Sequence, residues 1–165
     1  MAGCTTEDES TACTPLAATD FPCTDSDQCL SVTATWCFPD ASICANTDTD
    51  LNLQRPDGII VGAGSGASTN TNGCILDGDD LAILVDPDGD GETGPFHENI
   101  TCSPYSHAQP PDRIDAGRYV VEVDDSVPEL FSTEIVLLDI NVDGQTSCQI
   151  VDIGDGPARV EVIYP

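Results

Sequence analysis

Short apolar runs separated by turn residues fill most of this chain, and this pattern constrains its fold most strongly. From residue 47 onward the runs read DLNLQ, GIIVG, LAILV, RYVVEV, TEIVLLDINV, CQIVDI and ARVEVIY. Each run either alternates apolar and polar residues or is continuously apolar, as strands do. Between two of them, Asp143-Gly144 predicts a type I′ hairpin turn. No run has a useful helical period, so we predict an all-β chain. Roughly seven or eight short strands favour an antiparallel β-sandwich, jelly-roll-like in layout.

The nine cysteines predict a disulfide framework. No two cysteines form a CxxC pair and the only histidines are His97 and His107, so a zinc site is disfavoured. Disulfides persist in oxidising compartments, which places the chain outside the cytosol. An odd count leaves one cysteine over, and Cys4 is the best candidate. A Cys74–Cys102 bridge is one option, although Cys148 could equally take either partner.

Three segments differ in composition. Residues 1–22 are rich in Thr, Ser and acids and predict a flexible tether. Residues 23–46 carry four cysteines and predict a compact, disulfide-stapled annex. Residues 47–165 hold the strand pattern and predict the β-sandwich domain.

The first residues, Met-Ala-Gly-Cys, resemble the end of a bacterial lipoprotein signal, whose cysteine becomes lipidated. That resemblance predicts an extracellular or outer-membrane surface protein anchored through Cys4. A chance Ala-Gly-Cys sequence is the alternative. No apolar run reaches the roughly 18 residues of a membrane span, so we expect no membrane crossing.

Charge excludes one class of partner. Thirty acidic residues face four arginines and no lysine, for a formal net charge of −26. Nucleic acids and anionic membranes are bound through clustered Lys and Arg, so we expect neither as a partner. Strong acidity instead suggests divalent cations or a saline habitat.

Acidic clusters stand at the predicted strand ends. They comprise Asp48 and Asp50, then Asp77, Asp79 and Asp80, then Asp86, Asp88 and Asp90. The last cluster has the alternate spacing of the first half of an EF-hand calcium loop. Its twelfth position is His97 and no helices flank it, so it is no EF-hand, but Glu98 follows and could close a coordination sphere. We predict Ca²⁺ here; a solvated turn is the alternative.

The order of these motifs resembles the YfaP-like family of bacterial secreted β-domains. The resemblance is carried by DTDLNLQRPDG, DDLAILVDPDGDGETGPFHENI and DAGRYVVEV. The family is related in layout to bacterial pre-peptidase C-terminal domains, which are calcium-associated jelly rolls. Asp48 and Asp50 match its first acidic pair and Asp86 and Asp88 its second, while Asn52 replaces the usual histidine. The resemblance implies location and calcium rather than an activity.

No catalytic constellation is recognisable, so we expect no enzyme. The loop GAGSGAS lacks the lysine and helix of a phosphate-binding loop. The long segment 103–115 carries Tyr105, His107 and Arg113, which could bind a glycan; an uneventful surface loop is the alternative. We therefore expect a calcium-binding surface protein with a structural or adhesive role. Its partner would be itself, as a homo-oligomer or filament, or a surface glycan, in which case it is a carbohydrate-binding module.

Overall fold

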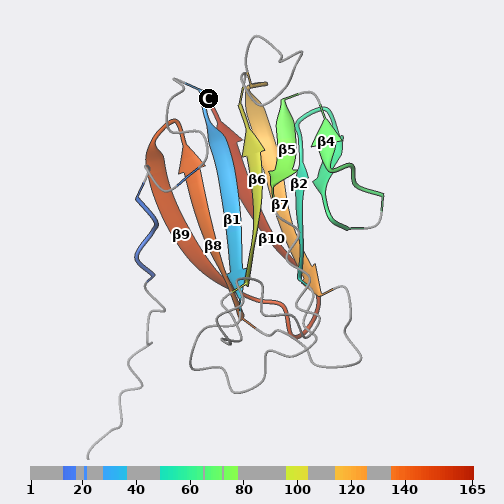
Figure 1. The fold of residues 1–165 in the computed structure, drawn as a ribbon, viewed down its shortest axis with the longest axis vertical. Coiled ribbons are helices and arrows are strands. Elements are labelled where there is room, and N and C mark those ends of the chain that lie inside the picture. Colours follow the sequence, from blue (N-terminus) through green and yellow to red (C-terminus); the bar gives the residue numbers. More distant parts are fainter. Residues whose placement is uncertain are drawn as a thin grey trace, which may run out of the picture.

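The computed structural model describes residues 13–17, 21, 28–36, 49–64, 66–71, 73–77, 96–103, 114–125 and 135–165. Every regular element among them is a strand, and the strands form two antiparallel sheets (Figure 1). The larger sheet has six strands in the order β4-β5-β6-β1-β8-β9, and the smaller has four in the order β10-β7-β2-β3. The predicted antiparallel β-sandwich is thus confirmed.

The six-stranded sheet is assembled from distant parts of the chain. Its strands are β1 (Leu30–Trp36), β4 (Asn70–Thr71), β5 (Cys74–Asp77), β6 (Phe96–Cys102), β8 (Ile135–Val142) and β9 (Gln145–Asp152). Those of the smaller sheet are β2 (Thr49–Gln54), β3 (Ile60–Gly62), β7 (Gly117–Asp125) and β10 (Ala158–Tyr164). The predicted strand over LAILV lies outside the described residues.

Strand β1 changes the predicted domain boundaries. It pairs with β6 on one side and β8 on the other, in the middle of the larger sheet. Residues 30–36 were expected in a separate annex, yet they are a central strand of the sandwich. The physical reason is their alternation: Leu30, Val32 and Trp36 point into the core and are fully buried.

The hydrophobic core lies between the two sheets. The larger sheet contributes Trp36, Ile100 and Leu138, and the smaller contributes Leu51 and Val121, each with no exposed surface. Together with their neighbours they form one cluster of buried side chains. Such burial contributes roughly 1.5–3 kcal/mol for each large side chain.

The hairpin between β8 and β9 has the predicted turn. Val142 pairs with Gln145 across a two-residue loop, and both loop residues have positive φ, Asp143 at 49° and Gly144 at 84°. Two positive φ values define a type I′ turn. The turn brings Asp143 back to β1, where its main-chain N–H donates to Cys29 O at 2.8 Å.

Two disulfides involve strands toward opposite edges of the larger sheet. Cys74 and Cys102 are direct neighbours on β5 and β6 and are bonded to each other. Cys13 is bonded to Cys148 on β9. Part of the segment expected to be a flexible tether is thereby fastened to the edge of the sheet, and Cys29 is disulfide-bonded as well.

Candidate functional site

Glu98 is the predicted calcium ligand that the structure places most clearly. It lies on β6 opposite Ala34, its side chain points between the sheets, and none of its surface is exposed. Its Oε2 accepts a hydrogen bond from the main-chain N–H of Leu51 at 2.7 Å. Leu51 belongs to the other sheet, so this carboxylate connects the two layers of the sandwich.

Asp50 lies next to that contact, on the opposite face of β2. It is half-buried and pairs in register with Asp124 of β7. The next pair in the register joins Thr49 to Asp125, a residue that is only 9% exposed. Like charges directly opposite one another on a sheet destabilise it. This end of the sandwich therefore concentrates negative charge on both faces of β2.

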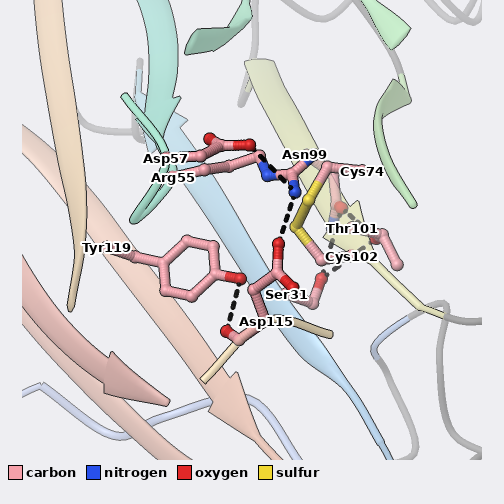
Figure 2. Close-up of a disulfide and its surroundings, with 9 residues drawn as sticks. All are labelled: Ser31, Arg55, Asp57, Cys74, Asn99, Thr101, Cys102, Asp115 and Tyr119. Carbon is pink, nitrogen blue, oxygen red and sulfur yellow. Dashed lines mark hydrogen bonds and ion pairs between the residues drawn. A yellow bond between two sulfur atoms is a disulfide. The ribbon is translucent and has the colours of Figure 1, made fainter. Parts of the chain in front are cut away.

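The long acidic segment begins and ends at two paired strands. It leaves β5 after Asp77 and enters β6 at Phe96, and Asp77 pairs with Asn99. The Cys74–Cys102 bridge holds the same two strands together (Figure 2). The segment therefore begins and ends on neighbouring strands, at the end of the sheet where Glu98 lies.

Most of the other predicted ligands fall outside the described residues. These are Asp48, Asp79, Asp80, Asp86, Asp88 and Asp90, together with Tyr105, His107 and Arg113 of the predicted binding loop. Across the part of the chain that the structure describes, no three His, Cys, Asp or Glu side chains come together as a metal-binding group. The described residues alone thus supply Glu98, with Asp50 nearby.

Sequence reasoning missed Asp124 and Asp125. Both end β7, immediately after the apolar run of that strand. Their signal was available in the sequence, because two adjacent acids at a strand end resemble the clusters already singled out. The sequence does not reveal the strand register, which places Asp124 opposite Asp50 and Asp125 opposite Thr49.

A polar network lies on the outer face of the larger sheet. Ser31 Oγ donates to Asn99 Oδ1 at 3.3 Å, and Asn99 Nδ2 donates to Thr33 Oγ1 at 2.8 Å (Figure 2 shows the Ser31 contact). Ser31, Thr33 and Asn141 are buried although they face outward. These three side chains are therefore not exposed on the outer face of the sheet.

Asp139 lies buried on the same face. It is 1% exposed, and its Oδ1 accepts a hydrogen bond from Leu16 N at 3.0 Å. Burial raises the pKa of this carboxyl above its usual value, and the bond from Leu16 lowers it less strongly. The contact fixes the segment that Cys13 already attaches to β9.

One buried arginine organises the end of the sandwich near β7. Arg55 Nη2 lies 2.7 Å from Asp115 Oδ2 and 3.3 Å from Asp57 Oδ2 (Figure 2). Tyr119 donates from its hydroxyl to Asp115 O at 2.9 Å. Burial, partly opposed by Arg55, raises the pKa of Tyr119 to about 12. These contacts stabilise the loop that precedes β7.

An open depression of about 800 Å³ lies beside this network. Its lining includes three carboxylates, those of Asp57, Asp115 and Asp143, and the ring of Tyr164. The Tyr164 hydroxyl donates to Asp143 Oδ1 at 2.8 Å, and Cys29 N donates to the same oxygen at 2.8 Å. Burial and this bond raise the pKa of Tyr164. Asp143 is thus held by structural contacts at the edge of the depression.

No helix of the described residues is long and apolar enough to cross a membrane. Comparison with known protein families, with characterised proteins and with solved structures finds no significant match to any of them. The resemblance to YfaP-like domains therefore stays a prediction.

Proposed function

We propose that this chain is an extracellular surface protein whose β-sandwich binds calcium at one end and has a structural or adhesive role. The observation that supports this most directly is the burial of Glu98 between the sheets. An ionised carboxylate in an apolar interior is costly unless charges or hydrogen bonds compensate it. A divalent cation at this end of the sandwich would stabilise the charge further, in addition to the hydrogen bond from Leu51.

Two further features support the same ion. The segment 78–95, which connects β5 to β6, carries six more acidic residues in its sequence: Asp79, Asp80, Asp86, Asp88, Asp90 and Glu92. Asp50 and Asp124, opposite one another, add a like-charge pair. Carboxylates that repel one another in this way are stabilised when several of them share a hard cation such as Ca²⁺.

The role follows from the type of site. Calcium held by oxygen ligands on rigid strands would not take part in a catalysed reaction. The ion would instead stabilise the fold or connect neighbouring molecules. We propose the second copy of the chain as the partner that calcium connects. Net charge −26 opposes self-association, and bound calcium would reduce that repulsion.

Thermal melts test the proposal. We expect the Tm to rise by several degrees in calcium at about 100-fold its Kd, since such a ligand adds roughly 2.7 kcal/mol to native-state stability. Because any salt screens a charge of −26, the control is sodium chloride at matched ionic strength, with magnesium as a second control. Identical melts in calcium, in magnesium and in matched sodium chloride would contradict the proposal.

Sedimentation velocity tests the partner separately. Calcium should increase the mass of the sedimenting species if copies associate. If the chain stays a monomer at every calcium concentration while its Tm still rises with calcium, the calcium site is supported and the calcium-connected assembly is contradicted.

A further inference from the structure

The outer face of the smaller sheet carries a depression of about 270 Å³ that the preceding functions do not use. All four strands of that sheet contribute side chains to it. They are Asn52 and Gln54 from β2, Ile60 from β3, Arg118, Val120 and Glu122 from β7, and Arg159 from β10. The site is therefore built on paired strands, the most rigid part of the molecule.

Asn52 is the unusual member of this lining. It is 8% exposed, and its Oδ1 accepts a hydrogen bond from Gly64 N at 3.0 Å. Its Nδ2 carries two N–H donors on the same amide. A ligand in the depression would meet this amide at its wall.

The glycines of the GAGSGAS segment explain how Asn52 is held. A Cβ at Gly62 would collide with Asn52 Oδ1 and with Leu51 O, and one at Gly64 would crowd Asn52 Nδ2. Gly62 also has a φ of 155°, inside the region that favours glycine. The segment thus packs closely on Asn52 and fixes the orientation of its amide.

Charges around the depression are balanced. Arg118 Nη2 lies 2.7 Å from Glu161 Oε1, and Arg159 Nε lies 2.6 Å from Glu122 Oε2. Because each guanidinium is paired with a glutamate, the lining has no excess charge of either sign to select a charged ligand. A polyanion is disfavoured by the net charge of −26 on the whole chain. Together, these charges favour an uncharged ligand in the depression.

We propose that this depression binds one ring of a neutral sugar. Sugar hydroxyls both donate and accept, and the lining offers donors in Asn52 and the arginines and acceptors in Gln54 and Glu122. The side chains of Ile60 and Val120 provide an apolar floor for the C–H face of the ring. The volume is near the lower limit of ligand pockets, so it suits one ring rather than several. Among the described residues no aromatic side chain lines it, and we expect affinity of about 1 mM or weaker.

Backbone amide NMR of the full chain, titrated with neutral hexoses, N-acetylhexosamines and their short oligomers, tests the proposal. We expect shifts at Asn52, Gln54 and Val120 that saturate and persist in 0.5 M sodium chloride. Gln54→Ala and Arg159→Gln should each weaken binding at least fivefold. Gln149→Ala, the same kind of change at an exposed position of β9, should leave it unchanged.

Three results would overturn the proposal. They are no shifts at 100 mM of any neutral sugar, equal binding by Gln54→Ala, Arg159→Gln and the parent chain, or tighter binding of glucuronate than of glucose. The last would identify an anion site. Because the titration is read at the smaller sheet, its outcome does not depend on whether calcium binds.

Discussion

Glu98 on β6 accepts a hydrogen bond at 2.7 Å from the main-chain N–H of Leu51 on β2, and so connects the two sheets through a buried carboxylate. Glu98→Gln keeps this acceptor but removes the charge. We therefore predict that Glu98→Gln folds, yet loses at least half of the calcium-dependent rise in Tm.

The control for this prediction is Glu161→Gln, which removes one exposed charge on β10, opposite Val120 and farther along β7 from Asp124. It should retain the full calcium response. An undiminished response in Glu98→Gln would show that Glu98 does not bind the ion.

The Cys13–Cys148 bridge closes a long stretch of chain, with a sequence separation of 135. Replacing both residues with serine should destabilise the fold by about 2–4 kcal/mol, because the unfolded chain regains freedom. Limited proteolysis should then cleave the N-terminal segment first. A denaturant midpoint equal to that of the parent chain would contradict this.

Asp139 should stabilise the fold less when ionised than when neutral. Its pKa is raised, so its favourable contribution is present at low pH and is lost as the pH rises through that value. Asp139→Asn keeps an oxygen for Leu16 N. We predict that this variant has a higher Tm than the parent at pH 7, and that the difference shrinks toward pH 3.

Asp115 compensates the buried guanidinium of Arg55. Asp115→Asn should cost about 1–2 kcal/mol, a range kept low because Asp115 itself is more than half exposed. Asp57→Asn removes the longer contact and should cost less. Chemical denaturation of both variants would measure the difference, and a larger loss in Asp57→Asn would be inconsistent with the geometry.

Tyr119 should make the free energy of unfolding depend on pH in the alkaline range. Its folded pKa is raised from 10.0 to about 12, so the stability it contributes is complete below pH 10 and is lost as the pH approaches 12. Tyr119→Phe should be less stable than the parent below pH 10, and the gap should narrow above it. Absorbance titration at the tyrosinate band gives the pKa directly.

The sequence predicted most strands because alternation and turn residues are local signals. Asp143-Gly144 is an example, since the turn type depends only on those residues. Strand β1 was assigned to an annex although Leu30 to Trp36 alternate regularly. Local pattern could not reveal that this segment pairs with β6 and β8, because those contacts join residues far apart in sequence.

The candidate site was predicted less completely. Glu98 was identified from its place after the acidic segment, but its full burial was not, since Glu is seldom buried. Asn52 was noted only as a departure from a family pattern. Its buried amide depends on the packing of Gly62 and Gly64, which spacing alone does not reveal.

The central position of β1 has a consequence for how the chain is made. A ribosome releases residues 30–36 long before residues 135–142, which form one of the two strands that flank them. The larger sheet therefore cannot form completely during early synthesis. Until β8 is made, the backbone groups on one edge of β1 have no partner strand. Folding should be slow and completed only after most of the chain has emerged, so a chaperone that shields this early segment would improve its yield.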